Sequence, residues 1–467
     1  MLQRHAVRRW ACLVGSFVLL TAALPTSAQA PADVRAGFLK WASSSLYRIG
    51  NGDLLASTED LRPIDKMIGD AKIVGVSEGV HGGAEPLIFR NRLFKHLVEH
   101  LGFRAIAMES GIVESRMLND YVTQGKGEFD TVLRQGFSRG FDTFRQNGEL
   151  IRWMRDYNAR LPPGAAKVQI YGLDVSGSPG SFDAERRPDT ALRSALEFLQ
   201  TVDAPAASAL QSRVERFLPV LKSIDGYGAL PESERDTLTA AIADLVSLVE
   251  RQRLVYLSKT TPEDFDWGER VAIGARQTDT WFRRMPPGWK PADGFAWLRY
   301  GHQVRDRSMA DNLDWVRRRL GPRARVLVFA HVAHLGTTAV KDPETAYRES
   351  IPMGVYLKER FRSDYVNVLN LTVNGEIEYC SATPRRVMPL TPPPESAVES
   401  LFAAVNVPRY LLDLRRAPLA VSAWLQQVHD HWNGFNSFQF ATSSSFDLVY
   451  FVSPVSAACK PLANTVP

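Results

Sequence analysis

The sequence predicts an α/β fold in which a mainly parallel sheet is flanked by helices and interrupted by an inserted helical subdomain. Short runs rich in Val and Ile recur along the chain, and most of them show no alternation of polar and apolar residues. Such runs are typical of strands that are buried on both faces of a parallel sheet. Helical patterns separate the runs, and a long middle section has no strand signal at all.

The first 30 residues predict an export signal. Arginines at positions 4, 8 and 9 precede an apolar run from Ala11 to Leu24, and Ala28-Gln29-Ala30 follows. This order is typical of a secretory signal peptide that is cleaved after Ala30. The apolar run is shorter than the roughly 20 residues that a membrane span needs. We therefore expect a periplasmic or secreted protein without a stable membrane anchor.

Charge and cysteine content argue against a nucleic-acid-binding protein and against a zinc site built from cysteines. The 467 residues carry a net charge of +5, and three of the positive charges belong to the leader, so nothing calls for a nucleic-acid partner. Cys12 is lost with the leader, which leaves Cys380 and Cys459. Two distant cysteines argue against a thiolate zinc site. Whether they pair in an oxidising compartment stays open, because sequence does not give their distance.

Four of the strand candidates end in ionisable residues. The runs KIVGV, RAIAM, VQIYGL and RVLVFA lead to Glu78, Glu109, Asp174 and His331, and a fifth run, YVNVLNLTV, begins at Tyr365. Ligands of open parallel sheets bind beyond the carboxyl ends of the strands, so we expect these four side chains to meet at one edge. The alternative is that they are ordinary polar residues that face solvent.

The middle of the chain predicts a helical insertion or cap over residues 183–305. Apolar residues recur there at spacings of three and four, as in ALRSALEFLQTV. The insertion divides the α/β domain into residues 31–182 and 306–467. An aromatic-rich passage towards its end contains Trp267, Trp281, Trp289 and Trp297. Packing in the core is the favoured interpretation of these side chains, and lining of a cleft is the alternative.

Residues 75–79, GVSEG, match the G-x-S-x-G pattern of a serine nucleophile elbow. Asp174 and either His331 or His334 follow in the order that an α/β-hydrolase uses. However, only residues 31–76 precede Ser77 after the leader, too few for the strands that come before the elbow in that fold. A turn from strand to helix also favours Gly and Ser for backbone reasons. We therefore favour chemistry at Glu78 and His81 over a nucleophilic Ser77.

The remaining histidines are interpreted as structural. His96 and His100 are four residues apart on a predicted helix, but leucines occupy its core stripe. We therefore expect both histidines at the surface rather than in a metal site. His429 and His431 alternate in a polar segment near the C-terminus, and no catalytic role is predicted for them.

Several blocks, taken together, resemble the erythromycin esterase family. The first is GVSEGVHG, followed by Arg90 within IFRNRLFKHLVEHLGFRAIAMESG; then come SRMLNDYV, GELIRWMRDYN, YGLDVSG, RDRSMADNLDWV, RVLVFAHVAHLG, SIPMGVYLKERF and FDLVYFV. The resemblance spans nearly the whole chain after the leader. It implies a hydrolase of a small-molecule carboxylic ester, a macrolide lactone among the candidates, and a mechanism without a metal or other cofactor.

The resemblance also implies roles for individual residues. His81 would be the general base that activates water, with Glu78, Glu109, Arg90, His331 and His334 around it. Such chemistry needs a group that orients the base and a cation or donor for the developing oxyanion. Glu78 or Glu109 can orient His81, and Arg90 or a protonated His331 can stabilise the oxyanion. Asp174 and Arg305 are expected to bind substrate.

Two positions depart from the family's usual pattern. Ser77 stands where glycine is usual, and Val332-Ala333 replaces the common Asn-Ala between the paired histidines. The lost Asn removes a hydrogen-bonding group near the site, so the identity of the ester stays open.

The same side chains permit a second function. Glu78, His81, Glu109, His331 and His334 combine imidazole and carboxylate ligands that suit Zn, Mn or Fe. The alternative is therefore an exported metal- or haem-binding protein without turnover. A nearby Arg90 would repel a divalent cation, which favours the hydrolase. The sequence predicts no oligomeric state.

Overall fold

In a computed structural model, the structure describes residues 29–176, 187–288, 298–341, 350–379 and 385–459. Residues 1–28 of the predicted leader, Trp289, Trp297 and Cys380 lie outside the described residues. Cys459 is disulfide-bonded, but because Cys380 is not described, whether the two cysteines pair stays open. No helix in the described ranges is both long and apolar enough to cross a membrane.

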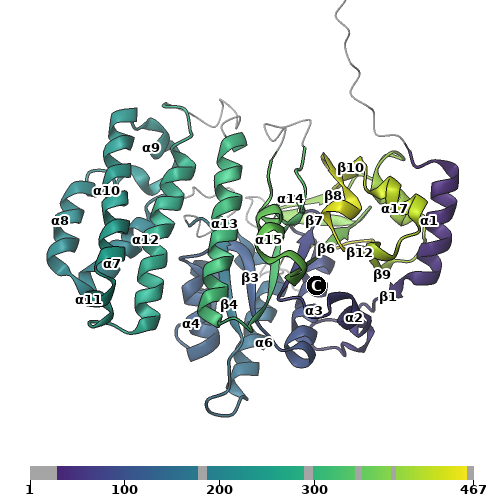
Figure 1. Ribbon diagram of the computed structural model, residues 1–467, viewed down its shortest axis with the longest axis horizontal. Coiled ribbons are helices and arrows are strands. Elements are labelled where there is room, and N and C mark those ends of the chain that lie inside the picture. Colours follow the sequence, from purple (N-terminus) through teal and green to yellow (C-terminus); the bar gives the residue numbers. More distant parts are fainter. Residues whose placement is uncertain (1–28, 177–186, 289–297, 342–349, 380–384, 460–467) are drawn as a thin grey trace, which may run out of the picture.

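An eight-stranded sheet forms the centre of the molecule (Figure 1). In spatial order its strands are β1 (Tyr47–Arg48), β9 (Arg409–Asp413), β12 (Leu448–Val452), β6 (Tyr365–Leu371), β2 (Ile73–Glu78), β5 (Arg325–His331), β3 (Phe103–Gly111) and β4 (Gln169–Asp174). All pairings from β12 to β4 are parallel, whereas β9 runs antiparallel to β12 and β1. The predicted α/β fold with a mainly parallel sheet is confirmed.

The strand order brings the predicted strand-end residues to one edge. Strands β2, β5, β3 and β4 are consecutive neighbours in the sheet. The register pairs Glu78 with His331 across β2 and β5, and Gly111 with Asp174 across β3 and β4. Because parallel strands end on the same side, the four ionisable residues lie close together at their carboxyl ends.

Alternate residues of the buried strands face two different apolar cores. Leu327 and Phe329 of β5 pack on the side of α3 (Ala84–Leu101) and α6 (Arg145–Ala159), while Val326 and Val328 pack on the other side. Helices α1 (Ala32–Ser45), α13 (Leu298–Leu320), α15 (Met353–Phe361) and α17 (Leu419–Leu425) supply that second core. Burial on both faces explains why these strands show no polar alternation.

Among the described residues between β4 and β5 the structure has helices and no strands (Figure 1, left). This region comprises α7 (Thr190–Val202), α8 (Ala204–Val214), α9 (Ile224–Ala229), α10 (Glu232–Arg251), α11 (Arg253–Leu257), α12 (Pro262–Phe282) and α13. Most of it packs around a core of its own, which includes Trp281, and Trp267 is fully buried against the sheet side. Helix α13 continues through residue 305, so the division of the chain at that residue stays a prediction.

Shorter elements complete the fold. They are α2 (Pro63–Ile68), α4 (Ser115–Gln124), α5 (Phe129–Gly136), α14 (Val332–Leu335), α16 (Val398–Ala403) and α18 (Thr442–Ser445), with the two-stranded ribbons β7 (Glu376–Tyr379) with β8 (Arg386–Pro389) and β10 (Val428–Trp432) with β11 (Ser437–Ala441).

The expected surface position of His96 and His100 is confirmed for His100 and wrong for His96. His96 is 1 % exposed and its ring contacts Thr58 and Asp65, because helix α3 is covered on that side by the preceding segment. His429 and His431 are also buried, on β10 rather than in a solvated tail. His431 bonds to Glu399. Polar partners from distant segments, which the sequence does not reveal, bury these imidazoles.

Candidate active site

A carboxylate and a histidine form a dyad in the turn between β2 and α3. Strand β2 ends at Glu78, and the His81 Nδ1 atom lies 2.8 Å from the Glu78 Oε1 atom. Glu78 has a side chain that is 2 % exposed, compared with 12 % for His81. An ionised carboxylate only accepts hydrogen bonds, so it fixes the proton on Nδ1. The Nε2 atom of His81 is then the acceptor nitrogen.

The turn itself depends on Gly82. Its φ is +92°, and an added Cβ would lie 2.7 Å from the carbonyl oxygen of Glu378. Glycine alone reaches such a conformation without strain and permits the close approach. Gly83 then precedes α3, so the chain turns from strand to helix within a few residues of His81.

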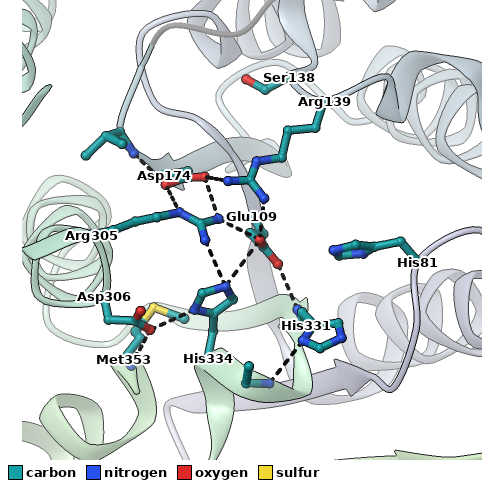
Figure 2. Close-up of polar contacts among 12 residues, drawn as sticks. His81, Glu109, Ser138, Arg139, Asp174, Arg305, Asp306, His331, His334 and Met353 are labelled. Atoms are coloured by element: carbon teal, nitrogen blue, oxygen red, sulfur yellow. Dashed lines mark hydrogen bonds and ion pairs between the residues drawn. The ribbon is translucent and has the colours of Figure 1, made fainter. Parts of the chain in front are cut away.

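Glu109 is the hub of a buried cluster beside the dyad (Figure 2). Its carboxylate accepts hydrogen bonds from the His331 backbone N–H at 2.8 Å, from Arg305 Nη2 at 2.6 Å and from Arg139 Nη1 at 3.2 Å. Burial opposes ionisation, but His334, Arg305 and Arg139 outweigh it and hold the pKa of Glu109 well below its usual range. Glu109 is therefore suited to hold its neighbours in position rather than to accept a proton as a general base, because its carboxylate oxygens already accept hydrogen bonds.

Asp174 and Arg305 form a two-pronged ion pair within the cluster. The Arg305 Nε and Nη2 atoms donate to the two oxygens of Asp174 at 2.8 and 2.7 Å. Burial lowers the pKa of Arg305, but Asp174 and Glu109 outweigh this effect and raise it. Both residues are only 2 % exposed. The geometry therefore favours a positioning role over the predicted direct contact with substrate.

Neighbouring carboxylates favour the protonated form of His334 in this cluster. Its Nδ1 atom lies 2.8 Å from Asp306 Oδ1 and its Nε2 atom 3.3 Å from Glu109 Oε1. Burial lowers the pKa of His334, but Asp306 and Glu109 outweigh burial and raise it to about 9. Its Nε2 atom is also 3.1 Å from Arg305 Nη1, a contact between two proton-bearing nitrogens that the surrounding carboxylates offset.

His331, in contrast, is neutral. Burial, together with the neighbouring His81, lowers the pKa of His331 to about 3. Its Nδ1 atom accepts from the Ala333 backbone N–H at the start of α14, and its Nε2 atom contacts the carbonyl oxygen of Gly79 at 3.0 Å. The expectation of a protonated His331 is therefore wrong, because both ring nitrogens are held by the backbone in a desolvated place.

Arg90 is buried in the core, with its guanidinium over the ring of Phe329. It is fully buried, its guanidinium donates to Asn91 and Asn147, and it lies 4.6 Å over the ring of Phe329. Burial lowers the pKa of Arg90 to about 9, although the Glu78 carboxylate opposes this shift. Because Arg90 is fully buried and bonded to these partners, the structure gives no reason to assign it to an oxyanion.

Arg139 belongs to the site although, like Asp306, it was not predicted from the sequence. It has a left-handed φ of +61° and a side chain that is 12 % exposed. The neighbouring Ser138 is fixed by Ser110 and Gly111, to which it is joined by two hydrogen bonds. Figure 2 shows the guanidinium of Arg139 above Glu109, on the side towards which the His81 ring points. Only the following Gly140 hints at a turn, so no motif marks this arginine.

Ser77 does not sit at an exposed elbow. It is 1 % exposed, lies within β2 opposite Ala330, and its hydroxyl accepts a hydrogen bond from the Asn370 backbone N–H at 3.0 Å. This geometry suits a structural serine in the sheet.

The residues proposed as metal ligands are engaged with protein partners. His331 is bonded to backbone through both ring nitrogens, and His334 contacts Asp306 and Glu109. In the described part of the chain, no group of three or more His, Cys, Asp and Glu side chains is arranged to hold a metal ion.

The family model for erythromycin esterase matches residues 98–455. This chain belongs to the erythromycin esterase family. The matched region begins after the Glu78–His81 dyad and contains Glu109, Asp174, Arg305, His331 and His334. The chain is thus an erythromycin esterase-family hydrolase.

Two relatives from Escherichia coli are similar over most of the molecule. Erythromycin esterase type II is 24 % identical over 66 % of this chain and 71 % of the relative. Erythromycin esterase type I is 27 % identical over 64 % of this chain and 69 % of the relative.

Solved structures show the same fold. A Bacillus cereus protein aligns with a TM-score of 0.75 and 21 % identity, covering 91 % of this chain and 99 % of that chain. A mutant of the erythromycin esterase EreC in its open conformation aligns with a TM-score of 0.67 and 20 % identity, covering 90 % and 99 %. At these identities the two solved structures show that this chain shares their fold, and no more than the fold.

Proposed function

We propose that this protein hydrolyses a carboxylic ester by direct attack of water that His81 deprotonates. The observation that carries the proposal is the 2.8 Å contact between Glu78 and His81 at the rim of a buried, charged cluster. Glu78 holds the His81 ring with its proton on Nδ1, and Nε2 takes the proton of the attacking water. His81 later returns that proton to the leaving alcohol.

The developing oxyanion needs a cation, and Arg139 is the best-placed candidate. Its guanidinium is partly exposed, and Glu109 and Asp174 hold it from below at 3.2 and 3.4 Å. A preorganised charge of this kind stabilises the tetrahedral intermediate without reorganisation during the reaction. The buried side chains beneath it then position Arg139 and do not react themselves. These are Glu109, Asp174, Arg305 and His334.

The substrate class follows from the relatives and is part of the proposal. The names of two relatives contain erythromycin esterase, so a macrolide lactone is the first ester to test. Export of the protein rests on the leader pattern, and fractionation of cells that express the full chain tests it. Recovery of uncleaved protein in the cytosol would contradict export.

The experiment is an activity profile of the purified protein on p-nitrophenyl esters and erythromycin, with wild type, His81→Ala and Ser77→Ala side by side. We expect ester hydrolysis by wild type and Ser77→Ala, and a rate lower by about 10² to 10⁴ for His81→Ala. Treatment with EDTA should leave the rate unchanged. Labelling of Ser77 by a fluorophosphonate, or activity that a chelator abolishes and one added metal restores, would overturn the mechanism.

A further inference from the structure

A surface groove rich in arginine lies on the helical region, between α12, α13 and α15. It has a volume of about 760 Å³, within the range of small-molecule sites. Five arginines line it: Arg270, Arg276, Arg284, Arg307 and Arg318. The acidic side chains of its lining are Asp311 and Asp314. The described lining therefore carries an excess of positive charge.

The two aspartates are already shared. Asp311 pairs with Arg307 and with Arg360, and Asp314 pairs with Arg318 and Arg360. Across the described ranges, Arg276 and Arg284 form no ion pair with a carboxylate. Uncompensated positive charges in one groove repel one another unless an anion joins them.

Arg270 lies at the bottom of the groove and lacks a full set of partners. It is 5 % exposed, whereas Arg276 is exposed. Its Nη1 atom donates to Asn312 at 2.7 Å, but its Nε atom has no hydrogen-bond partner among the described residues. Burial, and then the nearby Arg318, lower the pKa of Arg270 to about 10. Among the described residues this guanidinium has no ion pair with a carboxylate, so its charge adds to that of the groove that it lines.

We propose that this groove binds a small molecule that carries two or more anionic groups, such as phosphate or carboxylate. Guanidinium forks match the paired oxygens of both groups, and several arginines along one groove favour a ligand with more than one of them. Ile273, Val304 and Tyr356 add apolar contact area along the walls, which suits a ligand with a carbon frame.

The groove is separate from the ester site. Arg305 and Asp306 of α13 face the Glu109 cluster, whereas Arg307 and Asp311 line the groove. Residues two positions apart on a helix point to different sides. Binding in the groove is therefore independent of the proposed hydrolysis.

Isothermal titration calorimetry of the purified protein in low salt, with pyrophosphate and with citrate as ligands, tests the proposal. We expect saturable binding with one site per chain, weakened by added NaCl because salt screens the arginines. The double variant Arg276→Gln and Arg284→Gln should weaken binding by about tenfold or more, since each charge-assisted hydrogen bond is among the strong ones. Both residues are exposed, so the fold should be preserved.

The matched control is the double variant Arg134→Gln and Arg160→Gln, which removes the same charge from exposed positions on α5 and directly after α6. It should bind the anions as wild type does. Preference for pyrophosphate over citrate would identify a phosphorylated ligand, and the reverse a polycarboxylate. Equal weakening by both double variants, or no saturable binding of either probe below about 10 mM, would overturn the proposal, because such affinity is that of a non-specific contact.

Discussion

The two halves of the candidate active site differ in exposure and in how fully their side chains are paired. In the outer half, His81 and Arg139 each have side chains that are 12 % exposed and lie on turns. In the inner half, the side chains of Glu109 and Arg305 are 2 % exposed and that of Asp174 is 3 % exposed, and they are bonded to one another. The difference separates groups that can meet a substrate from groups that hold them in place.

The inner half shows how buried charges are tolerated. Glu109, Asp174 and Asp306 of the inner half face Arg305 and protonated His334, and Arg139 of the outer half adds a third positive charge from the rim. Each charge lies within hydrogen-bonding distance of an opposite one, which offsets the cost of desolvation. Removing any member of the inner half is therefore expected to affect stability, while removing a member of the outer half is expected to affect turnover.

The largest expected effect is on turnover, in the outer half. His81→Ala should lower kcat by about 10² to 10⁴, the usual contribution of a positioned base. The melting temperature should change little, because the ring is at the rim of the cluster. Steady-state kinetics on the best ester, with circular dichroism as the check on folding, measures both. A variant that keeps wild-type kcat would show that His81 is not the base.

The next effect is on stability, in the inner half. Arg305→Ala should lower the free energy of unfolding by about 3 to 5 kcal/mol, because it leaves Asp174 and Glu109 buried without their main partner. The matched control is Arg307→Ala, two residues further along α13, whose pair with Asp311 is half exposed; there we expect about 1 kcal/mol or less. Urea unfolding measures both. Equal losses in the two variants would contradict the division into halves.

Arg139 should again affect turnover, by a smaller factor than His81. Arg139→Ala is expected to lower kcat by about 10² to 10³ with little change in KM, as for the loss of one oxyanion donor. The left-handed φ of this residue complicates the variant, since Ala is strained there. Arg139→Gly removes the same guanidinium but suits the backbone. Equal losses of kcat in both variants would assign the effect to the guanidinium; recovery in Arg139→Gly would assign it to the backbone.

The smallest effect is the pH dependence of stability that His334 imposes. Its pKa rises from 6.5 in the unfolded chain to about 9 in the folded protein, so the folded state binds the extra proton between these values. The stabilisation is complete below pH 6.5 and is lost as the pH rises through about 9. We expect a loss of about 1 to 3 kcal/mol over this window.

Urea unfolding at pH 6 and pH 9.5 measures this loss, with His334→Gln as the reference. The variant cannot take up the proton, so the part of the pH dependence that belongs to His334 should be absent from it. If wild type and variant lose the same stability over the window, His334 is not protonated in the folded protein.

Much of the fold and part of the site could be predicted from the sequence. Unalternated Val and Ile runs indicated strands that are buried on both faces, and the structure has them as β2, β3, β4, β5 and β6. The ionisable residues that end four of these runs meet at one sheet edge, because parallel strands share a direction. The Glu78–His81 spacing was also legible, since three residues are enough for a contact within one turn.

Other features depend on segments that are far apart in the chain, and only the tertiary structure decided them. Whether His331 or His334 carries the charge depends on Asp306, whose carboxylate lies 2.8 Å from one ring and not the other. Arg139 enters the site from a loop that no motif marks, and Arg90 leaves it because α3 turns that side chain into the core. Sequence determines which groups end the strands, but burial and long-range pairing determine their charge states, and these depend on distances that only the folded chain defines.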